Sequence, residues 1–208
     1  HFLSVMSHEI RTPMNAGIGL SHLLIEDNPR EDQLENLRTL QFSAENLLGL
    51  INDILDFNKI DSGKLILERV PFEPKNLINR IIHSYSYQTR DKALEIIYEP
   101  DFSIPNTLVG DPVRIAQILN NLISNAIKFT DKGFIKIILE LVNKESDHVN
   151  IRFTVKDSGI GVAPSKVDSI FDAFTQASSD TTRKYGGTGL GLAIVKKLTK
   201  LFGTEIHL

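Results

Sequence analysis

The sequence predicts a multidomain fold of the α and α+β classes, with a long helical hairpin followed by an α/β sandwich. Over the first part of the chain, apolar residues recur in alternating steps of three and four, as in the seam of a helical bundle. After Gly63 the periodicity changes to short alternating segments mixed with helical ones. Strands and helices without regular alternation favour a sheet covered on one face by helices.

Composition limits the possible functions. The chain has 208 residues, 41% hydrophobic content, a net charge of -3 and no cysteine, which suits one or two domains with a full core. Disulfides and thiolate metal sites are excluded, and the interspersed basic residues argue against a nucleic-acid partner. No apolar run approaches the roughly 18 residues of a membrane helix, and no signal-peptide pattern occurs. We expect no membrane contact within this segment.

The hairpin is expected from Phe2 to Glu26 and from Glu31 or Asp32 to about Asp61, with a turn at Asp27-Asn28-Pro29. Gly63 is placed as a C-terminal cap. The first seam comprises Leu3, Met6, Ile10, Pro13, Gly17, Leu20 and Leu24. The second comprises Leu37, Gln41, Ala44, Leu48, Ile51, Leu55 and Asn58, with a parallel set at Leu40, Leu47 and Ile54. This apolar surface exceeds what one pair of helices hides, so residues 1–62 should form a homodimeric four-helix bundle.

Residues 63–208 should form the second domain. The pattern predicts strands at 64–70, 93–98, 107–109, 134–142 and 149–156, and the chain ends just into a further strand after Gly203-Thr204. Helices are expected at 74–90, 111–129, 164–171 and 188–201. Because the last strand is cut short, we expect the sheet to lack an edge.

His8 is a candidate nucleophile on the first helix. On the heptad of the seam it falls opposite the core, and an exposed imidazole with a pKa of about 6.5 is mostly uncharged at neutral pH. Glu9 follows directly, Thr12 shares the face of His8, and Pro13 should kink the helix nearby. The plain alternative is that His8 is an ordinary solvated side chain.

The helix after Asp111 carries three polar candidates. Asn121 and Asn125 lie four residues apart on one face, and Lys128 follows on the same side. Carboxamide oxygens suit Mg²⁺ held mainly by phosphates, and a lysine adds positive charge for those phosphates. Two asparagines on an exposed helix face are the alternative.

Two glycine-containing segments complete the candidate site. Asp157, Gly159 and Gly161 follow a strand, where glycines leave room for a ligand and an aspartate can accept a hydrogen bond from an adenine amino group. An ordinary turn after a strand would explain these residues equally well. The polar segment 175–187, after the Phe171 and Phe174 pair, has the composition of a mobile lid. It ends in glycines directly before an apolar helix, suited to phosphate contact, with Gly187, Thr188, Gly189, Leu190 and Gly191 as the candidates.

These motifs, in this order, resemble the catalytic core of sensor histidine kinases. The string Ser-His-Glu-Ile-Arg-Thr-Pro-Met-Asn from Ser7 resembles the phosphoacceptor box, and the later motifs resemble the N, G1, F and G2 boxes. The resemblance covers nearly the whole chain. It implies a Bergerat-type ATP-binding fold, ATP and Mg²⁺ as cofactors, and autophosphorylation of His8.

The resemblance also implies individual roles. Asn125 ligates Mg²⁺, Asn121 and Lys128 attend the phosphates, and Asp157 reads adenine. Glu9 serves as general base, and Thr12 supports dephosphorylation of the regulator. The implied partners are a second copy of the chain and a response-regulator receiver domain.

Several alternatives stay open at this point. The resemblance implies a sensor kinase, which could be of the hybrid type. In such a protein this segment is the cytoplasmic portion, and the full-length protein is associated with the membrane. The rival functions are an ATPase of the same superfamily, gyrase-like or chaperone-like, and a non-catalytic dimerisation scaffold. Gly17 departs from the pattern, because a bulky aliphatic residue is expected at its seam position.

Overall fold

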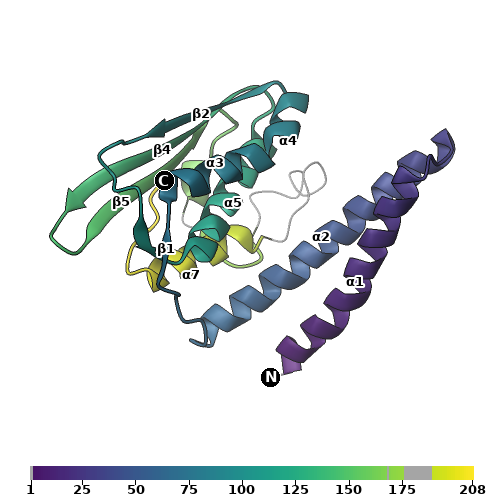
Figure 1. Ribbon diagram of the computed structural model, residues 1–208, viewed down its shortest axis with the longest axis horizontal. Helices are drawn as coiled ribbons and strands as arrows, with labels where there is room; N and C mark the ends of the chain where they lie inside the picture. The colour runs from purple at the N-terminus through teal and green to yellow at the C-terminus, as the bar shows by residue number, and fades with distance from the viewer. Residues whose placement is uncertain (1, 168, 176–188) are drawn as a thin grey trace. The chain divides into compact units, whose positions relative to one another are not determined.

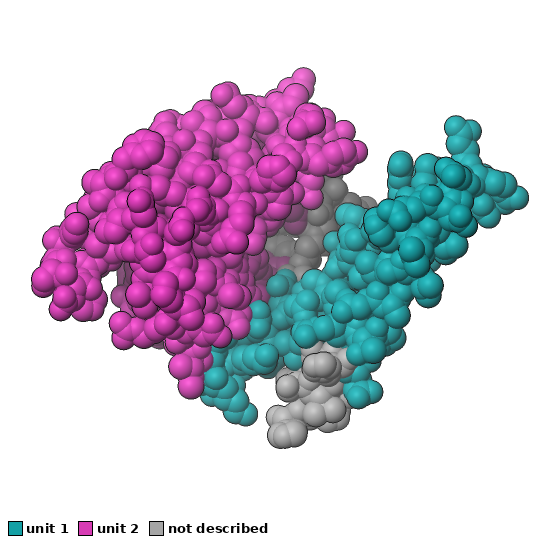
Figure 2. Space-filling model, viewed as in Figure 1, with its two compact units in different colours: residues 1–65 teal, residues 66–208 magenta. Residues whose placement is uncertain are grey.

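The computed structural model describes residues 2–167, 169–175 and 189–208. The chain divides into two compact units, His1–Leu65 and Ile66–Leu208, which Figure 2 shows in teal and magenta. Each unit has its own secondary structure.

The first unit is a helical hairpin. Helix α1 spans Phe2–Glu26 and helix α2 spans Glu31–Asp61, as the apolar periodicity predicts (Figure 1). Asn28 adopts a left-handed backbone conformation with φ of 50° in the connecting turn, a conformation that asparagine tolerates better than most residues. Gly63 follows α2 with φ of 64°, as expected of a glycine that ends a helix.

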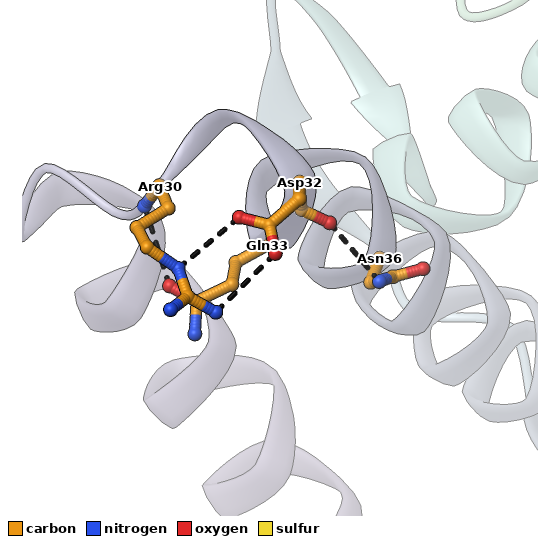
Figure 3. A network of polar contacts seen from close by, with 4 residues as sticks. All are labelled: Arg30, Asp32, Gln33 and Asn36. Carbon is orange, nitrogen blue, oxygen red and sulfur yellow. Dashed lines mark hydrogen bonds and ion pairs between the residues drawn. The ribbon is translucent and has the colours of Figure 1, made fainter.

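A polar network fixes the start of α2 (Figure 3). Arg30 precedes the helix in an extended conformation, and its backbone N–H donates to the Gln33 side chain at 3.3 Å. The Arg30 guanidinium donates to both carboxylate oxygens of Asp32 at 3.1 and 3.2 Å. The Gln33 carboxamide thus supplies an acceptor for an N–H at the helix start, as the second residue of a capping box does.

The inner face of α2 matches the predicted seam, whereas that of α1 matches it only in part. On α1, the described residues that are buried or half-buried are Ile10, Arg11, Met14, Gly17, Ile18, Ser21 and Ile25. Two predicted seam residues, Ile10 and Gly17, are therefore among them. Leu20 and Leu24, predicted for the seam, are 61% and 53% exposed in the single chain. The predicted seam is therefore wrong at Pro13, Leu20 and Leu24, because the apolar residues of α1 occupy more than one face.

The second unit is a three-stranded sheet with helices packed on one face (Figure 1). Its order is β2-β4-β5, from Leu94–Pro100, Gly133–Lys144 and Val149–Asp157, with β2 parallel and β5 antiparallel to β4. The helices are α3 (Pro74–Ser84), α4 (Ser86–Asp91), α5 (Pro112–Phe129) and α7 (Gly191–Leu201). Two shorter strands, β1 (Val70–Phe72) and β3 (Leu108–Gly110), pair antiparallel beside this sheet.

The core of this unit lies between β4 and the helices. Alternate β4 residues are fully buried, and they pack with apolar residues of α3 and α5 such as Ile78 and Ile123. Burial of every second β4 residue follows from the two-residue repeat of a strand. The buried β4 residues are Ile135, Ile137 and Leu139.

Two polar side chains tie the connections to this core by hydrogen bonds. The Asp101 carboxylate accepts from the Ser103 N–H and hydroxyl at 2.8 and 2.6 Å, and from the Leu141 N–H at 3.1 Å. These hydrogen bonds, led by the Ser103 hydroxyl, hold the pKa of Asp101 below its usual value. Lys92 donates from Nζ to the Ile127 carbonyl at 2.7 Å, which places a cation at the C-terminus of α5.

Four predicted elements differ from the structure. The helix predicted at 74–90 is divided at Tyr85 into α3 and α4. Residues 64–69 form no strand, and β1 begins only at Val70, where pairing with β3 supplies its hydrogen bonds. The helix predicted at 164–171 appears as two 3₁₀ turns, η1 (Pro164–Lys166) and η2 (Ser169–Phe171). Residues 204–208 are irregular, so the strand expected after Gly203-Thr204 is wrong for this chain.

Candidate functional site

Helix α5 is held at its start by Asp111. The Asp111 side chain accepts from the Arg114 N–H at 3.0 Å as the N-cap, and its second oxygen accepts from the Glu68 N–H at 3.0 Å. Pro112 occupies the first helical turn, where its missing N–H is harmless. The buried residues Ile123 and Ile127 then fix which face of α5 packs on the sheet.

The three polar candidates lie along α5 as predicted. Asn121 is half-buried and donates from Nδ2 to the Gln117 carbonyl at 3.0 Å. Asn125 is also half-buried, and its carboxamide makes no hydrogen bond within the described part of the chain. The Lys128 Nζ lies 5.0 Å from the centroid of the Phe129 ring, and desolvation by burial lowers the pKa of this ammonium.

Asn121 meets the first residue of helix α7. A Cβ atom added to Gly191 would lie 2.6 Å from Asn121 Oδ1, far inside an ordinary contact. The structure therefore brings two motifs together that lie 70 residues apart in the sequence. Because the N–H groups at a helix start attract anions, the phosphates of a nucleotide would find a carboxamide and a helix N-terminus side by side.

The Asp157 segment turns tightly against the end of α5. Asp157 closes β5, and its Oδ1 accepts from the Gly159 N–H at 2.8 Å, while the Ile160 N–H donates to the Phe129 carbonyl at 3.3 Å. A Cβ on Gly159 would lie 2.4 Å from that carbonyl oxygen, so only glycine fits. Gly161 adopts φ of 67°, a conformation that glycine tolerates best.

The residues on either side of the predicted lid meet. Phe174 donates its N–H to the Gly189 carbonyl at 3.1 Å, and Leu190 is 1% exposed. Gly189 has φ of 67°, and a Cβ there would lie 3.1 Å from the Thr175 carbonyl oxygen. Gly187, Thr188 and most of the lid segment 175–187 lie outside the described residues.

The histidine segment lies on α1. His8 belongs to this helix, although its side chain is outside those described, and the side chains of Glu9 and Thr12 are exposed. Arg11 donates from Nη2 to Asn52 Oδ1 at 2.9 Å, which joins the turn after His8 to α2. Sequence patterns did not single out Asn52, because its spacing continues neither apolar seam.

The described residues fit a nucleotide with a phosphate-bound cation. They contain no group of three or more histidine, aspartate or glutamate side chains that could hold a metal. A cation here would rely on substrate oxygens together with the Asn125 carboxamide, the mode of binding that Mg²⁺ prefers. In the part of the chain that is described, no helix combines the length and apolarity that crossing a membrane requires.

One residue of this region carried no recognisable signal in the sequence. Thr130 follows α5, is fully buried, and lies beside Gly159. A single threonine after a helix has no distinctive pattern, and only the fold places it next to Asp157.

Comparison with known proteins agrees with this arrangement. Residues 1–63 match the model of the His Kinase A (phospho-acceptor) domain, and residues 110–208 match that of the histidine kinase-, DNA gyrase B-, and HSP90-like ATPase. Two relatives are the signal transduction histidine-protein kinase BarA of Escherichia coli K12, 40% identical, and the sensor histidine kinase GacS of Pseudomonas protegens, 44% identical. Each match covers 99% of this chain and 22% of the relative.

A solved structure shows the same combination of units. The crystal structure of full-length ShkA in complex with AMPPNP matches with a TM-score of 0.76 and 32% identity, over 97% of this chain and 41% of that one. The chain spans only 22% of the length of each of the two curated relatives named above. With both domains matched in order along the sequence, the chain belongs to the sensor histidine kinases and contains their phosphoacceptor domain and their ATP-binding catalytic domain.

Proposed function

We propose that this chain phosphorylates itself on His8 with ATP and passes the phosphoryl group to an aspartate of a response-regulator receiver domain. The observation that carries the proposal is the meeting of Asn121 with the start of α7, in a chain whose first helix bears the histidine motif. This contact supports a single nucleotide reaching both the N-box and the G2-box elements. The proposed domains are residues 1–62 and 63–208, with a hinge near Asp61 to Gly63.

The nucleotide contacts are assigned by residue. Asp157 accepts from the adenine amino group, with Gly159 and Gly161 leaving room for the base. Asn121 and Lys128 contact the phosphates, as do the backbone groups of residues 187–191. Asn125 ligates Mg²⁺, which supplies positive charge for the phosphate oxygens when bound.

The transfer step uses residues of α1. A ring nitrogen of His8 attacks the γ-phosphorus, the N–P bond forms, and the bond to the bridging oxygen breaks with its electron pair leaving on ADP. Glu9 accepts the proton from the other ring nitrogen. The phosphoramidate then transfers its phosphoryl group to the regulator aspartate, and Thr12 positions water for dephosphorylation of the regulator.

The acting unit is a homodimer. Leu40, Leu47 and Ile54 recur every seven residues on α2 and are 55%, 46% and 40% exposed in the single chain. Leu20 and Leu24 add exposed surface on α1. Since burying a leucine side chain is worth about 1.5–3 kcal/mol, pairing these stripes in a four-helix bundle stabilises the association.

The decisive experiment is incubation with γ-labelled ATP. We expect label that is stable to alkali and lost in acid, as a phosphoramidate is, and absent from His8→Ala. His22→Ala is the matched control, because His22 lies on the same helix with its side chain 62% exposed. Labelling that persists in His8→Ala refutes the assignment.

The same assay separates the rival functions. Free phosphate without labelled protein would identify an ATPase of the gyrase-like or chaperone-like kind. Neither label nor phosphate would indicate a dimerisation scaffold.

Dimerisation is tested separately. Leu47→Asp should yield monomers in sedimentation, whereas the exposed neighbour substitution Asn46→Asp adds the same charge and should leave the dimer intact. A dimeric Leu47→Asp variant would show that this stripe is not the interface.

A further inference from the structure

Thr130 holds a buried hydroxyl that no group in the described part of the chain uses. The residue is 0% exposed, and its Oγ1 has no hydrogen-bond partner among the described residues. A buried hydroxyl without a partner lowers stability, so each such group in a folded protein calls for an explanation, such as an ordered water or a role in a binding site.

This hydroxyl lies close to the carboxylate assigned to adenine. Thr130 Oγ1 and Asp157 Oδ1 are each 2.8 Å from the position that a Cβ on Gly159 would take, so the two oxygens lie at most 5.6 Å apart. A water that forms hydrogen bonds of about 2.8 Å to two oxygens, with its usual bent angle, bridges a separation of roughly 4.5 Å. That separation lies within the limit set by Gly159, so the geometry allows a single water between Thr130 and Asp157.

The chemistry of the three groups around Gly159 is complementary. The Phe129 carbonyl and the Asp157 carboxylate only accept hydrogen bonds, and both already accept one from a backbone N–H. The Thr130 hydroxyl can donate as well as accept. It is the one member of this set able to supply a further hydrogen bond toward the carboxylate.

We infer that Thr130 is a positioning residue of the nucleotide site, whose hydroxyl orients the Asp157 carboxylate through a bridging water toward the 6-amino group of adenine. The inference rests on the proposed function, which assigns adenine to Asp157. Because Thr130 is fully buried, it acts through Asp157 and does not touch the nucleotide.

Two variants of the full chain test this role. Thr130→Val keeps the shape and removes the hydroxyl, whereas Thr130→Ser keeps the hydroxyl. We expect Thr130→Val to bind ADP about tenfold more weakly in calorimetry, the usual effect of losing one buried hydrogen bond. Its stability to urea without nucleotide should be unchanged or higher, because an unpartnered hydroxyl has been removed. Thr130→Ser should bind ADP as the wild type does.

A second nucleotide isolates the 6-amino group. Purine riboside 5′-diphosphate lacks that group, so wild type and Thr130→Val should bind it equally. Thr89→Val is the matched control, since Thr89 is also buried but donates its hydroxyl to the Tyr85 carbonyl at 3.1 Å. It should lose stability and keep its affinity for ADP.

The outcomes distinguish this inference from the proposed function. Failure of the wild type to bind ADP refutes the proposed function. Normal ADP binding by Thr130→Val shows that the residue has no part in nucleotide binding. Equal weakening for both nucleotides shows that the hydroxyl does not act on the amino group through Asp157.

Discussion

Replacing Gly159 by alanine should disrupt the part of the site that we propose binds adenine. The added Cβ would lie 2.4 Å from the Phe129 carbonyl oxygen, so the atoms must separate by about 1 Å to reach the ordinary contact distance of 3.4 Å or more. Phe129 ends α5 and Thr130 beside it is fully buried, so the loop must move instead.

The magnitude follows from the contacts that this movement breaks. The hydrogen bonds from the Gly159 and Ile160 N–H groups, at 2.8 and 3.3 Å, would both be lost. At about 1 kcal/mol each, with about 1–3 kcal/mol for overpacking, the free energy of unfolding should fall by about 3–5 kcal/mol. ADP affinity should fall as well, because Asp157 loses its backbone donor.

Urea denaturation followed by tyrosine fluorescence measures this effect selectively. The chain has no tryptophan, and its four tyrosines all lie beyond Leu65, so the signal reports on the second unit. Gly161→Ala is the matched control. Gly161 has φ of 67°, and no atom lies within 4 Å of the position that a Cβ would take, so we expect the free energy of unfolding to fall by only about 1–2 kcal/mol. If Gly159→Ala is no less stable than Gly161→Ala, the steric argument is incorrect.

Three further predictions concern the same unit. Gly191→Ala should weaken ATP binding in calorimetry with little loss of stability, because its Cβ would push aside the Asn121 side chain, 2.6 Å away; unchanged affinity would contradict the assigned contact. Lys92→Met should lower the free energy of unfolding in urea by about 1–2 kcal/mol, since the Ile127 carbonyl loses a charged donor. Asp101 has a pKa below its usual value in the folded state, so its stabilising effect is complete above about pH 4 and is lost as the pH falls through the folded pKa. The free energy of unfolding, measured as the pH is lowered, should accordingly become more similar for wild type and Asp101→Asn. A difference in that free energy that stays constant with pH would refute this prediction.

The longest helices and the motif positions could be predicted from sequence alone. The bounds of α1 follow its apolar periodicity, and those of α5 follow the Asp111 cap and the buried stripe. Such features are local, because hydrogen bonds within a helix do not depend on distant residues. The short strand β1 was misplaced because its position is set by pairing with β3, 38 residues further on.

The contacts within the site were less accessible to prediction. The order of the motifs indicated that Asn121 and Gly191 belong to one site, but their direct contact depends on how α7 packs beside α5. The inner stripe of α1 was missed in part because Leu20, Leu23 and Leu24 lie together on the exposed face, so the apolar periodicity followed the leucines instead of Met14 and Ile18. Thr130 gave no signal, since burial and an unused hydroxyl are properties of the folded chain.

The rigidity of α5 has a consequence for how the site can evolve. Asn121 and Phe129 lie eight residues apart on one uninterrupted helix, which separates the proposed phosphate and base ends of the site by about 12 Å at about 1.5 Å per residue. Inserting or deleting one residue between them would rotate one end by about 100° relative to the other. Side chains along this part of α5 can therefore be substituted in evolution, but a change in its length would move the two parts of the proposed nucleotide site out of alignment.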